Sequence, residues 1–98
     1  MASTPEAKVK AAVVKQLKAI GAYYFYPVTG GYGRSGVPDI VGCYRGAFFA
    51  IECKTVGNKP TPLQAKNMAD ITTAGGLTWV VDERNMRDVA EKLRLAFG

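Results

Sequence analysis

Two carboxylates and a lysine at the open end of a predicted β-hairpin are the side chains best placed to do chemistry. The apolar segments 40–44 and 47–51 are rich in β-branched and aromatic residues, which predicts two antiparallel strands. A two-residue turn between them sets Asp39 directly opposite Glu52, with Cβ atoms about 5 Å apart. Lys54 lies two residues beyond Glu52 and therefore falls on the same face.

The turn that fixes this pairing is Arg45-Gly46. It pairs Tyr44 with Ala47 and Val41 with Ala50 if the two strands run on without interruption. Arg-Gly is a weaker type I′ signal than Asn-Gly, and a bulge at the glycine would shift the pairing by one residue. The register is therefore an expectation that the structure must test.

Two carboxylates held opposite each other repel, and one lysine neutralises only one of them. A divalent cation would satisfy both, because Mg²⁺ takes oxygen ligands and is commonly held by one or two carboxylates with waters. The alternative interpretation is a set of solvated charges at a strand end, since Asp, Glu and Lys are usually exposed. The spacing of the three residues favours the metal site.

The order Pro38-Asp39 followed by Glu52-Cys53-Lys54 resembles the signature of the PD-(D/E)XK nucleases, with both halves intact. With Glu6 upstream, Gly36-Val37 before the proline and Gln64 downstream, the chain is similar to the VRR-NUC branch over residues 4–82. The resemblance implies an α/β fold with a restriction-endonuclease-like αβββαβ core, in which helices flank a mixed sheet. The chain adds one C-terminal helix.

The resemblance also implies a reaction, the hydrolysis of a phosphodiester by water with Mg²⁺ as cofactor and Mn²⁺ able to substitute. Its catalytic residues would be Glu6, Asp39, Glu52, Lys54 and Gln64. Asp39, Glu52 and the backbone carbonyl of Cys53 would hold the metal. Glu6 would add a carboxylate to the metal sphere or bind its outer waters, and Lys54 would position the attacking water or stabilise the developing charge.

The balance of charge fits a polyanionic partner. The 98 residues are expected to form one domain, 1–98, and carry 13 Lys and Arg against 8 acids, for a net charge of +5. Acids gathered in one metal site would leave the remaining surface more basic still. Nucleic acid is the commonest partner of such a surface, and a merely soluble basic protein is the alternative.

The absence of histidine excludes several classes of function, namely His-dependent nucleases, imidazole zinc sites and Ser-His or Cys-His nucleophile pairs.

Cys43 and Cys53 are expected on opposite faces of the hairpin, too poorly placed for a disulfide, which favours a reduced compartment. The first residues do not resemble a signal peptide, and no apolar run approaches the roughly 18 residues of a spanning helix. A cytoplasmic protein without membrane association is expected, in the host cytoplasm if it is viral.

Three helices are predicted. Thr4-Pro5 and Thr61-Pro62 each combine an N-cap threonine with an N1 proline, and the helices they open should end at Gly21 and Gly75. Glu6 heads the buried stripe of the first helix, and Lys10 follows one turn later in the same sector. Gln64 likewise heads the apolar stripe of the second helix, where the sequence alone would make it polar surface. The last helix should begin at Asp82 or Asn85.

Strands are predicted at 23–28, with four aromatic residues in succession, and at 77–81. The loop 29–35 lacks the Gly-Lys-Ser/Thr ending of a P-loop, so no nucleotide cofactor is expected. The loop is either a plain connector or an arm beside the site whose side chains stack on bases or reach phosphate. The candidate nucleic-acid contacts are Lys10, Tyr32, Arg34, Ser35 and Lys59.

The predicted function is a Mg²⁺-dependent endonuclease acting on branched DNA, such as four-way (Holliday) junctions, as a homodimer. Residues 23–26 offer the dimer a contact surface, whereas four buried rings would leave a monomer that prefers flaps or nicked duplex. The rival classes are a non-catalytic nucleic-acid-binding module on the same fold and a small structural or assembly protein of a phage or mobile element. The intact Asp39, Glu52 and Lys54 favour the nuclease, because clustered carboxylates do not help to bind a polyanion.

Overall fold

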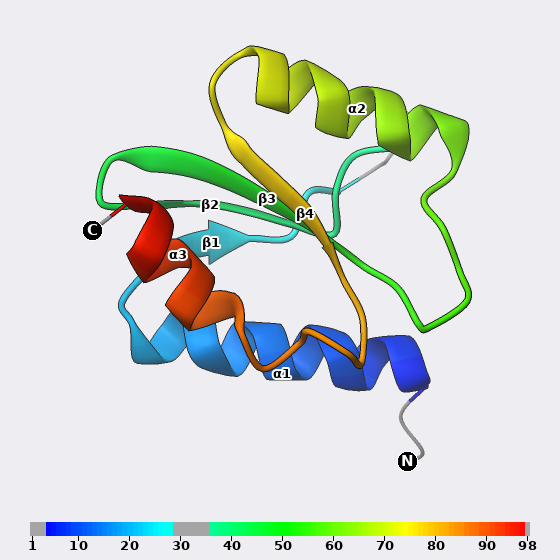
Figure 1. Cartoon of the computed structure of the whole chain (residues 1–98), viewed down its shortest axis with the longest axis horizontal. Coiled ribbons are helices and arrows are strands. Elements are labelled where there is room, and N and C mark those ends of the chain that lie inside the picture. The colour runs from blue at the N-terminus through cyan, green and yellow to red at the C-terminus, as the bar shows by residue number, and fades with distance from the viewer. Residues whose placement is uncertain (1–3, 29–35, 98) are drawn as a thin grey trace.

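Four strands form one mixed sheet with helices on both faces (Figure 1). The computed structural model describes residues 4–28 and 36–97. Within them the elements are α1 (Pro5–Ala19), β1 (Tyr23–Phe25), β2 (Ile40–Tyr44), β3 (Ala47–Cys53), α2 (Pro62–Thr73), β4 (Leu77–Val81) and α3 (Val89–Phe97). The strand order is β1-β2-β3-β4, antiparallel except for the parallel pair β3–β4. The predicted α/β class and element order are confirmed.

The hairpin has the expected register. Arg45 and Gly46 have φ values of 51° and 82°, and positive φ at both positions is typical of the type I′ turn that matches the twist of two strands. Tyr44 pairs with Ala47, and the ladder continues without a bulge to the pair Ile40–Ile51. Asp39 and Glu52 therefore follow the last pair at the open end of the hairpin.

The two threonine–proline sequences start helices as predicted. The Thr4 hydroxyl accepts a hydrogen bond from the backbone N–H of Ala7 at 3.1 Å. Thr61 and Gln64 form a reciprocal capping box at the start of α2, because each side chain accepts from the other residue's backbone N–H, at 3.2 and 2.9 Å. These caps fix where both helices begin, beside the end of the hairpin that carries Asp39.

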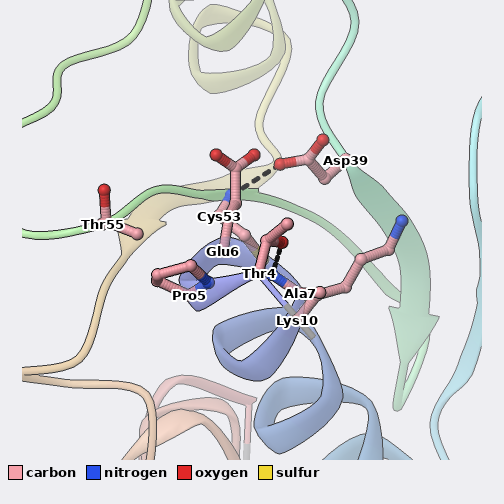
Figure 2. Close-up of a pocket in the computed structure, with 8 residues that line it drawn as sticks. All are labelled: Thr4, Pro5, Glu6, Ala7, Lys10, Asp39, Cys53 and Thr55. Atoms are coloured by element: carbon pink, nitrogen blue, oxygen red, sulfur yellow. Dashed lines mark hydrogen bonds between the residues drawn. The ribbon is translucent and has the colours of Figure 1, made fainter. Parts of the chain in front are cut away.

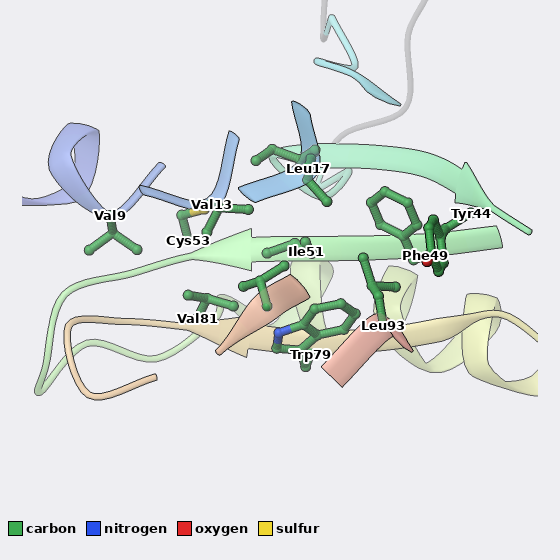
Figure 3. Close-up of a cluster of buried hydrophobic side chains, with 12 residues drawn as sticks. Val9, Val13, Leu17, Tyr44, Phe49, Ile51, Cys53, Trp79, Val81 and Leu93 are labelled. Carbon is green, nitrogen blue, oxygen red and sulfur yellow. The ribbon is translucent and has the colours of Figure 1, made fainter. Parts of the chain in front are cut away.

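Two apolar clusters hold the layers together. The larger lies between the sheet and the pair α1 and α3 (Figure 3), and its members include Val9, Val13, Leu17, Ile51 and Leu93, none of which is exposed. The smaller joins α2 to the other face of the sheet through Val41, Ala50 and Met68. No helix among the described residues is long and apolar enough to cross a membrane.

The first strand is shorter than predicted. It covers residues 23–25 instead of 23–28. Proline has no N–H to donate to a ladder, so Pro27 ends the pairing of this edge strand with β2. Residues 26–28 therefore lie outside the sheet.

The last helix begins later than predicted, at Val89 and not at Asp82 or Asn85. The Asp82 carboxylate accepts from the backbone N–H of Arg84 at 2.9 Å, and the Asn85 side chain accepts from the N–H of Asp82 at 2.8 Å. These local side-chain bonds offer the backbone an alternative to helical pairing and hold a turn instead.

Candidate active site

The open end of the hairpin is closed by a hydrogen bond from the backbone N–H of Cys53 to Oδ2 of Asp39, at 2.8 Å. The bond fixes the Asp39 carboxylate against the end of β3 (Figure 2). Asp39 is half-buried, so one edge of its carboxylate is presented to a hollow while the other edge is held by the backbone.

Glu52 is the most unusual side chain of the site. It is 1% exposed, and neither carboxylate oxygen has a hydrogen-bond partner among the described residues. Burial raises its pKa to about 8, and the neighbouring Asp39 carboxyl group adds to the rise. Burying a carboxylate without hydrogen-bond partners costs free energy unless a cation binds it. The two oxygens of Glu52 therefore fit a hard divalent metal.

Lys54 lies on the same face as Glu52, as the strand alternation predicts. Its Nζ is 4.0 Å from Oε1 of Glu52, and its side chain is 15% exposed. The ammonium lowers the pKa of Glu52, but burial and Asp39 outweigh it. One lysine therefore does not compensate the two carboxylates.

A hollow of about 490 Å³ opens beside Asp39, between the start of α1 and the end of β3. Figure 2 shows Glu6 reaching from α1 toward the strand end where Asp39 meets Cys53, whereas the Lys10 side chain extends away from Cys53. The hollow is lined by Thr4, Pro5, Glu6, Ala7, Lys10, Asp39, Cys53 and Thr55. Glu6 is exposed, so its carboxylate faces solvent within this hollow.

A second hollow of about 280 Å³ adjoins the first, with Lys10 and Asp39 in the lining of both. Gln64 lines this second hollow and is half-buried, so it borders the site from α2. Its side-chain carbonyl is engaged by the backbone N–H of Thr61 in the capping box. Gln64 thus holds the start of α2 in place while it lines the hollow.

Cys53 can contribute to the site through its backbone only. Its side chain is fully buried on the α1 face of the sheet, where desolvation, followed by the Asp39 carboxylate, raises the pKa of the thiol to about 12. A neutral thiol at physiological pH is neither a nucleophile nor a thiolate ligand. The side chain is a packing residue, as Figure 3 shows among Val9, Val13 and Val81.

The remaining predicted nucleic-acid contacts are Tyr32, Arg34, Ser35 and Lys59. Tyr32, Arg34 and Ser35 lie outside the described residues. Lys59 is exposed in the loop between β3 and α2, and it is not in the lining of either hollow that contains Asp39. Within the described residues no group of three or more Asp, Glu, Cys or His side chains is arranged to hold a metal ion.

Two residues near the site were not predicted. Thr55 lines the larger hollow, and its position two residues beyond Cys53 on an extending strand was an available signal. The Tyr26 ring packs under Lys10, whose Nζ lies 4.2 Å from the ring centroid. No sequence signal pairs these two residues, because they come from different elements.

The sheet, the hairpin ending in Asp39 and Glu52, and the helices that flank it define the fold of a PD-(D/E)XK-type nuclease. A solved structure described as a VRR_NUC domain has the same fold, with a TM-score of 0.75 and 24% identity over 98% of this chain and all of that one. "Putative nuclease p44" of Acyrthosiphon pisum secondary endosymbiont phage 1 is 31% identical over 85 residues, covering 86% of this chain and 89% of the relative. No family model matches the sequence. The chain belongs to the VRR-NUC family of nucleases.

Proposed function

We propose that this chain is a metal-dependent endonuclease that hydrolyses phosphodiester bonds in DNA, with Mg²⁺ as its cofactor and Mn²⁺ able to substitute. The observation that carries the proposal is Glu52, whose buried carboxyl group has no hydrogen-bond partner among the described residues and lies beside the carboxylate of Asp39. A divalent cation is the group that both carboxylates would bind, and such a cation would activate water and neutralise charge in phosphodiester hydrolysis.

The residues that would hold the metal are Asp39 and Glu52, together with the backbone carbonyl of Cys53. Glu6 would join them directly or through a bound water, since it lines the same hollow as Asp39. When bound, the metal lowers the pKa of a coordinated water and neutralises charge that develops on the phosphoryl oxygens. Asp39 contributes an orientation fixed in advance, because the Cys53 N–H already holds one of its oxygens.

Lys54 would act on the water or on the phosphate. Its side chain is mostly buried and its ammonium lies beside Glu52, so it stays near the reacting groups. In one role the ammonium orients the attacking water by hydrogen bonding, and in the other it stabilises negative charge on the phosphate. Gln64 would complete the border of the site through its free amide group.

The proposed substrate is branched DNA, such as a four-way (Holliday) junction, cut by a homodimer in which each 98-residue domain supplies one site. Two sites at a fixed spacing permit symmetric cleavage, and two-fold dimers are the commonest way to provide them. The proposed phosphate and base contacts are Lys10, Tyr32, Arg34, Ser35 and Lys59, and the net charge of +5 suits a polyanion. The phage source of the relative fits an enzyme of the host cytoplasm.

The test is cleavage of a labelled four-way junction with Mg²⁺, Mn²⁺ or Ca²⁺ and with excess chelator. Cleavage is expected with the first two metals and absent in chelator. Ca²⁺ should support binding with little turnover, because it takes six to eight loosely arranged oxygens at longer distances and polarises water less. Equal cleavage in chelator would show that the metal is not needed.

The matched variants are Asp39→Asn and Glu52→Gln, which keep side-chain size and remove charge. Each should lower the cleavage rate by at least about 100-fold while DNA binding is kept, since even outer partners of metal ligands are worth roughly 10- to 100-fold. Lys66→Ala on α2 is the control, because Lys66 pairs with Asp70 and lies on neither hollow. Wild-type cleavage by Glu52→Gln would place the metal elsewhere.

A further inference from the structure

A groove runs along α1 and begins where the active-site hollow ends. It has a volume of about 500 Å³, and Ala7 and Lys10 belong to the lining of both. The groove is lined by Ala7, Lys10, Ala11, Val14, Lys15, Lys18 and Tyr26. The groove therefore adjoins the active-site hollow along α1.

The lining of this groove has one sign of charge. Three of its seven residues are lysines and none is acidic. The whole of α1 carries four lysines against a single acid, Glu6, which lies at the active-site end. Because Lys15 and Lys18 are exposed, they can reach into solvent to meet an anion. A concave surface with cations alone attracts a polyanion more strongly than scattered surface charges do.

Tyr26 forms the wall of the groove opposite α1. Its ring holds the Lys10 ammonium at 4.2 Å by a cation–π contact and is itself packed edge-on against Tyr24. The ring is still 46% exposed, so one side remains free. A half-exposed aromatic ring beside lysines is the combination that binds a nucleic-acid strand through stacking and phosphate contacts.

We propose that this groove binds the DNA strand that flanks the scissile phosphate, with Lys15 and Lys18 on its phosphates and Tyr26 against a base or sugar. The inference rests on the proposed function, because it takes the hollow at Asp39 as the place of cleavage. Lys18 is eight residues beyond Lys10, or about 12 Å along the helix. At about 3.4 Å of rise per nucleotide, the phosphate at Lys18 lies roughly three to four nucleotides from Lys10, and the phosphate at Lys15 lies about two nucleotides from it.

The test compares the salt dependence of junction binding, measured in chelator, for wild type, Lys15→Ala/Lys18→Ala and the charge-matched control Lys66→Ala/Arg94→Ala. Each lost phosphate contact should reduce the slope of log affinity against log salt by about 0.9. Over a fourfold rise in salt the wild type should then lose about 12-fold more affinity than the groove variant. The control should keep the wild-type slope. A groove variant with the wild-type slope overturns the proposal, as does an equal change in the control.

A second measurement locates the contact. A neutral methylphosphonate placed two to four nucleotides from the phosphate bound at Lys10, which lines the cleavage hollow, should weaken binding by wild type and should not weaken binding by the groove variant further. Equal weakening of both proteins would overturn the groove proposal.

Failure of the groove proposal is distinguishable from failure of the proposed nuclease function. Metal-dependent cleavage by wild type with an unchanged salt slope in the groove variant would overturn the groove proposal alone. A reduced slope in the groove variant without cleavage by wild type would support the groove proposal and overturn the nuclease proposal.

Discussion

At the scale of single residues, ionisation of the buried Glu52 carboxyl group lowers the stability of the metal-free fold, and the same group is proposed to bind the metal. A carboxyl group with a folded-state pKa of about 8, against an ordinary value of 4.5, keeps a proton in the folded protein that it loses in the unfolded chain. Above pH 4.5 the unfolded state therefore binds fewer protons than the folded state, and stability falls as pH rises. Without metal, the fold should weaken progressively until the pH passes about 8.

The first prediction is that Glu52→Gln stabilises the metal-free protein at pH 7.5. Glutamine has nearly the same shape and cannot ionise, so its stability should not follow this pH trend. In chelator, wild type should lose up to about 1.4 kcal/mol of unfolding free energy per pH unit between pH 5.5 and 7.5, whereas the variant should stay nearly level. Urea unfolding at both pH values measures the difference.

The control for this prediction is Asp70→Asn, an exposed carboxylate on α2. It should follow the wild-type pH trend. A wild-type protein whose unfolding free energy rises from pH 5.5 to 7.5 in chelator would contradict the assignment of a raised pKa to Glu52. Added Mg²⁺ should stabilise wild type more than Glu52→Gln, since a ligand that binds the folded state alone raises its stability.

At the scale of elements, Gln16 links the first helix to the last. Its Oε1 accepts from the backbone N–H of Ala90 at 3.1 Å, and its amide group donates to the carbonyl of Met86. The first N–H groups of a helix have no partner within that helix. Gln16 therefore caps α3 from another element and fixes α3 against α1, on the face of the sheet where the main core lies.

The second prediction is that Gln16→Ala lowers the unfolding free energy by about 1–3 kcal/mol, because the N–H of Ala90 and the carbonyl of Met86 lose their partner. Lys8→Ala, at an exposed position of the same helix, should change stability by no more than about 0.5 kcal/mol. Hydrogen exchange should show faster exchange at residues 89–91 in Gln16→Ala. Equal stability of the two variants would mean that apolar packing alone holds α3.

Elements governed by local signals could be predicted from the sequence. The Arg45-Gly46 turn fixed the hairpin register, and two threonine–proline pairs fixed the starts of α1 and α2. The start of α3 could not be predicted, because Asp82 and Asn85 bond to the nearby backbone and so compete with the helix. Aspartate and asparagine have the same sequence signature when they cap a helix and when they hold a turn, so the sequence does not distinguish the two.

Some features of the candidate site could likewise be predicted from the sequence, and others depend on packing. Asp39, Glu52 and Lys54 lie on one hairpin, so pairing and alternation place them together. The burial of Glu52 and the loss of its hydrogen-bond partners depend on how α1 and α2 close over the sheet, which no local pattern encodes. The contact between Lys10 and Tyr26 depends on the same packing.

At the scale of the whole molecule, aromatic side chains lie exposed on the sheet face that also carries α2. Tyr23, Cys43 and Phe48 are register neighbours across β1, β2 and β3, and Phe25 follows two residues after Tyr23. Tyr23, Phe25 and Phe48 are 69%, 49% and 45% exposed, and together they form the aromatic face. The monomer alternative assumed that all four rings of residues 23–26 are buried, and that assumption is wrong.

The last prediction is that the aromatic face joins two copies in solution. A two-fold interface uses the same patch on both copies, and β1 is an edge strand, so a partner can approach without crossing another element. Three large rings left to water on a 98-residue chain would otherwise form an apolar patch of the kind that marks a contact surface. Light scattering at micromolar concentration should give about twice the 10.5 kDa mass of the chain.

Tyr23→Ser/Phe25→Ser should give the monomer mass. The control Val28→Ser, at an exposed position beyond the end of β1, should leave the dimer intact. A wild-type mass near 10.5 kDa would contradict the dimer and leave each site to cut a single strand on its own.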